Sequence, residues 1–168
     1  DLKSDFWEVI KVKGSGVKLS RDIKINFHKY LPEHDKSLYI DANINQLEDA
    51  DFDYDSDMIA MKHPARDCIY DEMNQCYYRN KDTYINMTPQ VTKYMYEGYP
   101  SNNGLLAAGV MFRKNNQKVI ALMELWWSEV EKGSHRDQLS FNYCLWKSPI
   151  NLEYMVYSKG FKINKHEN

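Results

Sequence analysis

Segments typical of β-strands alternate with segments typical of α-helices along this chain, and the alternation constrains its fold more than any other feature. Mainly apolar runs of strand length lie at positions 6–12, 37–40, 58–61, 105–112 and 152–157. Apolar residues recur with helical spacing in segments that begin near Ser20 and Arg136 and at positions 68–79, 88–97 and 117–132. Strands that alternate with helices predict an α/β fold.

Three single residues mark where predicted helices stop. Pro32 closes the first helix, because proline has no amide hydrogen to continue it. Gly98 and Gly133 follow two later helices, in the position where glycine often ends a helix. The longest helix, 117–132, is expected to turn these residues inward: Ile120, Met123, Trp127 and Val130.

Composition and charge limit the class of protein. A chain of 168 residues that is 43% hydrophobic and 27% charged fits one domain, 1–168, with a core of its own. A net charge of −2 argues against nucleic-acid binding, which depends on clustered Lys and Arg. We expect no membrane span, since no run of about eighteen apolar residues occurs. Cys68, Cys76 and Cys144 lack paired spacing and predict free thiols in a reducing compartment, so we expect a cytoplasmic location.

Asp41 lies in the stretch KSLYIDANINQ, where an apolar strand runs into polar residues. Asp and Asn commonly start turns, which is one interpretation. The other is that Asp41 and Asn43, on the same side of an extended chain, present oxygen atoms to a divalent cation at the end of a strand. The spacing alone leaves both open.

The order of several motifs resembles that of known nucleotide-sugar transferases. SRDIKINFHKYLPEHDKSLYIDANI is similar to the helix, Leu-Pro turn, strand and DxD element of enzymes with the GT-A fold. HPARDCIYDE, NNGLLAAGVMFRKNN, LWWSEV and SHRDQLSF resemble a glycosyltransferase-like family, once a domain of unknown function, with plant, bacterial and viral members. The most similar member we expect is the N-terminal glycosyltransferase domain of a chlorella virus protein, which would place this chain in the host cytoplasm.

The resemblance covers nearly the whole chain and implies a GT-A-like mixed, mainly parallel sheet flanked by helices. Because the opening DLKSDFWEVIKV resembles a later strand of the family, we expect the N-terminal strand or strands, with part of a uridine pocket, to lie upstream. The domain is then part of a longer, multidomain chain. A shortened relative is the alternative.

The resemblance also implies the site residues. A Mn2+ or Mg2+ ion is expected on Asp41, Asn43 and His166, although many GT-A enzymes have a second Asp where this chain has Asn43. For His166, an exposed side chain near the end of the chain is an equal alternative. Donor binding is expected from a set of polar and small residues: Arg21, Lys24, Asp41, Asn43, Gly104, Ala108, Gly109 and Arg136. For the three small residues, tight packing against a helix is an equal alternative. For Arg21, a solvated helix face is a nearly equal alternative. The remaining polar candidates, for an acceptor or donor pocket, are His63, Arg66 and His135.

Asp137 and Gln138 are the expected catalytic pair, because Asp-Gln resembles the pair that retaining GT-A enzymes direct at the anomeric carbon. The alternative for Asp137 is structural, since a carboxylate in the first turn of a helix is favoured by about 0.3–1 kcal/mol. The predicted function is metal-dependent transfer of a sugar from a UDP-sugar to a glycan hydroxyl, with retention. The alternative is a non-catalytic glycan- or nucleotide-binding module, for which thirteen tyrosines and four tryptophans supply aromatic surface.

Overall fold

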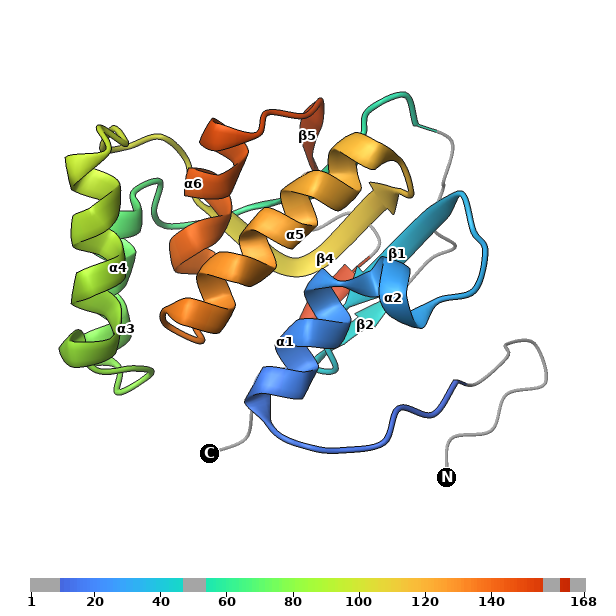
Figure 1. Cartoon of the computed structure of the whole chain (residues 1–168), viewed down its shortest axis with the longest axis horizontal. Helices are drawn as coiled ribbons and strands as arrows, with labels where there is room; N and C mark the ends of the chain where they lie inside the picture. Colours follow the sequence, from blue (N-terminus) through green and yellow to red (C-terminus); the bar gives the residue numbers. More distant parts are fainter. Residues whose placement is uncertain (1–9, 47–53, 156–160, 164–168) are drawn as a thin grey trace.

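The computed structural model describes residues 10–46, 54–155 and 161–163, which form six helices and six strands (Figure 1). The helices are α1 Val17–Ile25, α2 Phe27–Tyr30, α3 Ile69–Tyr78, α4 Tyr84–Tyr96, α5 Gln117–Lys132 and α6 Gln138–Lys147. The strands are β1 Lys36–Ile40, β2 Ile44–Gln46, β3 Met58–Lys62, β4 Leu106–Lys114, β5 Leu152–Met155 and β6 Phe161–Ile163. No helix among these residues is both long enough and apolar enough to cross a membrane.

The central sheet has four strands in the order β1-β4-β3-β5. β4 runs antiparallel to both of its neighbours, and β3 and β5 are parallel. The α/β class and the mixed sheet are therefore confirmed, but the prediction of a mainly parallel sheet is wrong. The reason is that residues 63–105 contain two helices and leave and rejoin the sheet at the same end, where the His63 amide donates to the Leu105 carbonyl at 2.8 Å. β4 must then run back along β3.

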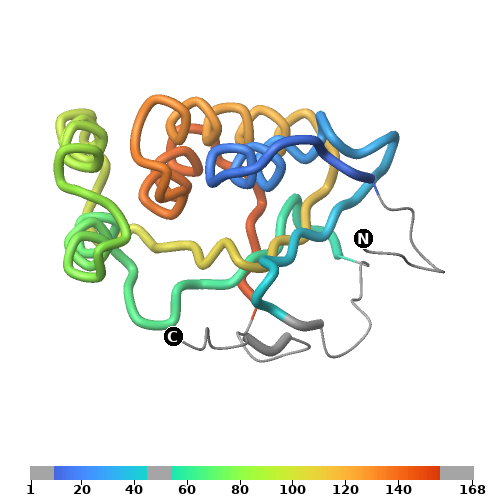
Figure 2. The backbone as a smooth tube through the Cα atoms, turned by 90° about the horizontal axis from the view of Figure 1, so that it is seen from below, coloured from blue at the N-terminus to red at the C-terminus, as the bar shows by residue number. Residues whose placement is uncertain are grey.

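Helices cover one face of this sheet. Figures 1 and 2 show α1, α5 and α6 on that face, while α3 and α4 lie side by side at one end of the molecule. The core between helices and sheet is built around Trp126 of α5, whose ring meets Phe141 of α6 edge to face at 4.8 Å. Met123 and Val130 are buried as predicted, whereas Ile120 and Trp127 are half-buried, because the inward face of α5 is centred on Val119, Leu122 and Trp126.

Some of the predicted helix boundaries are confirmed and others are wrong. α5 spans 117–132 as predicted, and the Asn116 side chain caps it by accepting from the Val119 amide at 3.0 Å. Gly98 follows α4 with a φ of 83°, the left-handed conformation expected there. The first helix begins after Gly16 instead of at Ser20, and it breaks at Asn26 into α1 and α2. α4 begins four residues before the predicted Thr88.

Two short strands, β2 and β6, pair antiparallel apart from the central sheet and were not predicted, because three-residue strands carry little periodicity. Of the strand predicted at 6–12, residues 10–12 have no regular structure, and residues 6–9 lie outside the described part. The late strand is described as far as Met155. Cys68, Cys76 and Cys144 are free, as expected, and all three are buried.

Candidate active site

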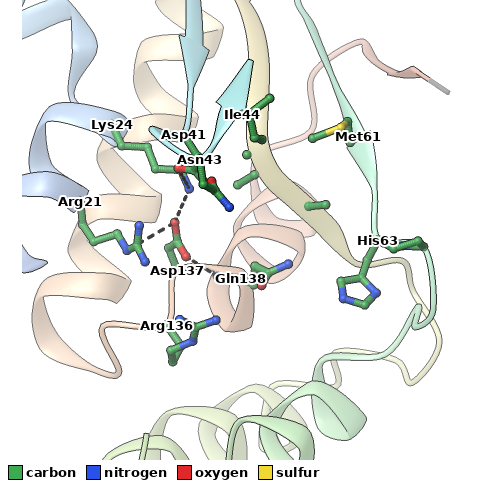
Figure 3. A pocket seen from close by; sticks show the side chains of 14 residues that line it. Arg21, Lys24, Asp41, Asn43, Ile44, Met61, His63, Arg136, Asp137 and Gln138 are labelled. Carbon is green, nitrogen blue, oxygen red and sulfur yellow. Dashed lines mark hydrogen bonds and ion pairs between the residues drawn. The ribbon is translucent and has the colours of Figure 1, made fainter. Parts of the chain in front are cut away.

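A cleft of about 440 Å³ opens beside β4, between the end of β1, the end of β3 and the start of α6 (Figure 3). Residues from five segments line it: Arg21, Lys24, Asp41, Asn43, Ile44, Met61, His63, Pro64, Ala107, Ala108, Gly109, Arg136, Asp137 and Gln138. Ten of these were candidates from the sequence. The fold therefore gathers in one place residues that are far apart in the chain.

A break in the β3–β4 ladder runs along the wall of the cleft. The register steps from Ala60–Met111 to Met61–Ala107, so that residues 108–110 of β4 lie outside this pairing. β1 continues beyond the break on the other side, since the Asp41 amide donates to the Gly109 carbonyl at 2.8 Å. The irregularity separates Asp41 on one side from Met61 on the other, which explains why the cleft lies at this point of the sheet.

Lys24 is the central cation of the site. Its ammonium nitrogen lies 2.7 Å from Asp137 Oδ2 and 3.9 Å from Asp41 Oδ1, and its side chain is only 3% exposed. Arg21, one helical turn earlier, places its Nε 3.7 Å from Asp137 Oδ2. Figure 3 shows these side chains of α1 pointing at Asp137 from one wall of the cleft. The two carboxylates are thus joined electrostatically through one lysine.

Asp137 is the N-cap of α6 and also a buried charge of the cleft. Its Oδ1 accepts from the Gln138 amide at 3.1 Å, and its carbonyl accepts from the indole N–H of Trp126 at 2.9 Å. Burial favours the neutral carboxyl, but the charges of Lys24 and Arg21 outweigh burial and hold the pKa of Asp137 below its ordinary value. Asp137 therefore caps α6, as the structural alternative predicted, and it also presents a charged carboxylate to the cleft.

The position of Lys24 depends on Arg113, which the sequence did not single out. Arg113 is 1% exposed, and its guanidinium donates to the Lys24 carbonyl at 2.6 Å while lying 4.1 Å from the centre of the Phe27 ring. A cation at the carboxyl end of a helix satisfies carbonyls that have no partner within the helix. Arg113 therefore links β4 to the last turn of α1, the turn that carries Lys24.

The loop that carries Arg136 and Asp137 is held by the start of α4. The Ser134 hydroxyl donates to the Asp82 carboxylate and accepts from the Arg136 amide at 3.0 Å. The Ser134 amide donates to the side-chain oxygen of Gln90 at 3.0 Å. Ser134 and Asp82 are both buried, so this polar network fixes the loop against α4.

Asp41 forms the turn of its first interpretation, and binding of a cation by its side chain stays a prediction. Its carbonyl accepts from the Ile44 amide at 2.9 Å, which closes a turn. Its side chain faces the cleft and accepts a hydrogen bond from the Tyr39 hydroxyl at 2.7 Å. Burial and this bond raise the pKa of Tyr39, so the hydroxyl stays a donor. Gly109 leaves room for the arrangement, because a side chain there would lie 2.8 Å from Ile44 and 3.3 Å from the second carboxylate oxygen of Asp41.

Asp41 and Asn43 place a carboxylate and a side-chain amide side by side on the cleft. Within the described ranges, no cluster of three or more acidic, His or Cys side chains is placed to hold a metal. One carboxylate and one amide nevertheless fit a Mg2+ or Mn2+ ion that takes its other ligands from a diphosphate and water. Asn43 lines the cleft beside Asp41 and matches that donor set. His166 lies outside the described residues.

The other candidates lie away from the cleft. Gly104 has a φ of 86° in the loop before β4, and a side chain there would meet Asn142 at 3.1 Å, so packing and turn geometry account for it. Arg66 forms an ion pair with Glu72 at 2.6 Å, next to His63. His135 lies 3.5 Å from Asp82, and its carbonyl accepts from Arg21 at 3.4 Å.

Sequence reasoning missed one supporting residue and several residues that line the cleft. Tyr39 does not line the cleft but orients Asp41, and the alternation of β1 places both on one side of the strand, which was a usable signal. Ile44, Met61 and Ala107 supply apolar walls. Nothing in their local sequence distinguishes them from core residues, so only the tertiary structure assigns them here.

Comparison with known proteins supports one family. Residues 4–165 match the family model described as TOD1/MUCI70, glycosyltransferase-like domain. No curated protein and no solved structure matches the chain. The resemblance to a glycosyltransferase-like family is confirmed, while the expected similarity to a chlorella virus protein and to the GT-A fold stays a prediction.

Proposed function

The chain belongs to the TOD1/MUCI70 glycosyltransferase-like domain family, and from this premise we propose that it transfers a sugar from a UDP-sugar to a hydroxyl group of a glycan. A glycosyltransferase-like domain implies a sugar donor and an acceptor. The proposal adds the identity of the donor nucleotide, a role for a metal ion and the residues that act.

One observation carries the proposal: the Asp137 carboxylate is buried but kept in its charged form on the wall of a cleft that also holds cations. Arg21, Lys24 and Arg136 line that cleft together with Asp41. Perturbed carboxylates with charged partners in a cleft are typical of functional sites. Cations suit the diphosphate of a donor, and a carboxylate suits the positive charge that develops at an anomeric carbon during transfer.

Each residue then has a role in the proposed reaction. Lys24, Arg21 and Arg136 bind the diphosphate. Asp137 stabilises the oxocarbenium-like transition state. Gln138 donates through Nε2 to the Leu106 carbonyl at 2.8 Å, so its amide oxygen is the atom that can accept from a sugar hydroxyl. We expect retention of the anomeric configuration, which NMR of the product would reveal.

Asp41 and Asn43 would hold a Mn2+ or Mg2+ ion, with His166 as a proposed third ligand. When bound, the ion would neutralise negative charge on the leaving diphosphate. Tyr39 keeps the Asp41 carboxylate oriented toward the cleft through its 2.7 Å hydrogen bond. Ala108 and Gly109, which are small and line the cleft, let the donor approach the backbone of β4.

The test is UDP release from a panel of UDP-sugars, with Mn2+ and with chelator, in the presence of mixed glycan acceptors. Release that depends on the donor sugar and is lost in Asp137→Asn supports the proposal. Binding of UDP-sugars without release or transfer under any condition would instead favour the binding module.

A separate observation favours the second candidate function, a non-catalytic glycan-binding module. α3 and α4 each end on an exposed aromatic side chain, Tyr78 at 71% exposed and Tyr96 at 89% exposed. Aromatic rings on a surface suit sugar faces. A Tyr96→Ala variant that loses glycan binding while donor turnover is absent in the parent would establish the module.

A further inference from the structure

A smaller pocket of about 160 Å³ adjoins the cleft, and we call it the side pocket. His63, Arg136 and Gln138 line both spaces, so they form the wall between them. The remaining residues of the side pocket come from the segment before α3, from α3 and from the turn that follows it: Arg66, Glu72, Gln75, Cys76, Arg79 and Lys81. Its volume suits a single charged group and is well below the usual range of about 300–1,000 Å³ for whole small-molecule ligands.

The side pocket is strongly cationic. Four of its lining residues carry positive charge, namely Arg66, Arg79, Lys81 and Arg136. The one carboxylate, Glu72, is buried and already paired with Arg66 at 2.6 Å. Positive charge is therefore in excess, and an anion in this space would be attracted.

Local backbone geometry brings two of these cations to the pocket. Asn80 adopts a φ of 52°, a left-handed conformation that Asn tolerates better than most residues. The Lys81 amide then donates back to the Cys76 carbonyl at 2.8 Å. This turn reverses the chain after α3 and sets Arg79 and Lys81 on the same pocket.

His63 supplies a second, independent indication of an anion. Its Nδ1 accepts from the amides of Ala65 at 3.2 Å and Arg66 at 3.0 Å, which assigns the ring proton to Nε2. That Nε2 lies 3.0 Å from a terminal guanidinium nitrogen of Arg66, which is always a donor. Burial and the charge of Arg66 lower the pKa of His63 and keep the ring neutral. Two donors thus face each other, and one oxygen of an anion beside them would accept from both.

We propose that the side pocket binds the carboxylate or phosphate group of an acidic sugar that reacts in the cleft. The shared wall means that a ring in the cleft can extend its charged substituent past His63 and Arg136. This inference rests on the proposed function, and it adds a preference for charged over neutral sugars. The anion can come from the acceptor glycan or from the donor sugar, and the experiment separates these sources.

The experiment compares the parent, an Arg79→Gln/Lys81→Gln variant and a Lys29→Gln/Lys118→Gln control. All four residues are exposed, so both double variants should fold, which melting temperature checks. Affinities are measured by NMR titration of UDP-loaded protein with glucuronate, glucuronate methyl ester and glucose 6-phosphate. We expect the parent to prefer the two anions over the ester. The pocket variant should bind the anions at least about fivefold more weakly, with the control unchanged.

Binding of UDP-glucuronate and UDP-glucose to the same proteins identifies the source of the anion. A selective loss for UDP-glucuronate in the pocket variant assigns the pocket to the donor sugar. A loss confined to the free anions assigns it to the acceptor. Equal parent affinity for glucuronate and its ester, or equal weakening by pocket variant and control, overturns the inference. Failure of UDP to bind any of the proteins would overturn the proposed function instead, while anion selectivity measured without UDP would still report on the side pocket.

Discussion

The ammonium nitrogen of Lys24 lies 2.7 Å from Oδ2 of Asp137, and the two side chains are 3% and 5% exposed. Water therefore solvates neither charged group well, and each charge is stabilised mainly by the other. Asp41 lies within 3.9 Å of the same ammonium group, so a change at Lys24 alters both carboxylates of the cleft.

Loss of Lys24 should destabilise the fold. Lys24→Met removes the cation nearest to the buried Asp137 carboxylate, and removal of one partner of a buried ion pair costs about 3–5 kcal/mol. We expect urea unfolding to report a loss of that order. The double variant Lys24→Met/Asp137→Asn should recover part of it, because no unpaired charge remains. A double variant that is less stable than Lys24→Met would contradict this account of the pair.

Asp137 should act on turnover more than on donor binding. Asp137→Asn keeps the size and the helix-capping ability of the residue but removes its charge. We expect turnover to fall about a hundredfold or more with UDP affinity within a few-fold of the parent. Asp35→Asn, an exposed residue outside the cleft, is the matched control. Turnover of Asp137→Asn close to that of the control would remove Asp137 from the catalytic role.

Stability should depend on pH through Asp137. Burial alone would raise its pKa, but Lys24 and Arg21 depress it in the folded protein, so the unfolded state binds more protons in acid. The stabilisation is complete above the unfolded pKa of about 3.9 and is lost as pH falls through the lower folded value. Urea unfolding between pH 7 and pH 3 should show a steeper acid loss for the parent than for Asp137→Asn. Parallel curves would mean that this carboxyl does not titrate as inferred.

Mn2+ should strengthen UDP binding through Asp41. The ion would be shared between the carboxylate and the diphosphate, so calorimetry should find weaker UDP binding in chelator. Asp41→Ala should abolish the metal effect, and Asn43→Asp should enhance it, because a carboxylate is a stronger ligand for a hard cation than an amide. Equal UDP affinity with Mn2+ and with chelator would exclude this use of the metal.

Arg113 should affect donor binding without touching the cleft. Arg113→Met removes the 2.6 Å hydrogen bond to the Lys24 carbonyl but keeps an apolar stem against Phe27. We expect KM for the donor to rise severalfold with a smaller change in kcat, because Lys24 is displaced while Asp137 stays in place. Arg113→Lys should restore part of the affinity, since lysine can still donate. A rise in KM that Lys does not reverse would point to general disruption of the core.

Much of the local structure and most of the site residues follow from the sequence by itself. Gly133 marks the end of α5, Gly98 marks the end of α4, and Asp137 lies at the start of α6, because capping depends on residues within one turn. The ordered motifs also identified ten residues of the cleft, since a family resemblance carries spatial information that periodicity does not.

Only the tertiary structure decided the direction of β4, the pairing of Lys24 with Asp137 and the support from Arg113. The alternation of strands and helices does not show at which end of the sheet the chain re-enters after the helices between β3 and β4. The antiparallel direction of β4 was therefore not predicted. Arg113 reads locally as a surface cation at the end of a strand, yet the fold buries it under α1. Such contacts join segments distant in sequence, and their energies depend on burial and charge that exist only after the chain has folded.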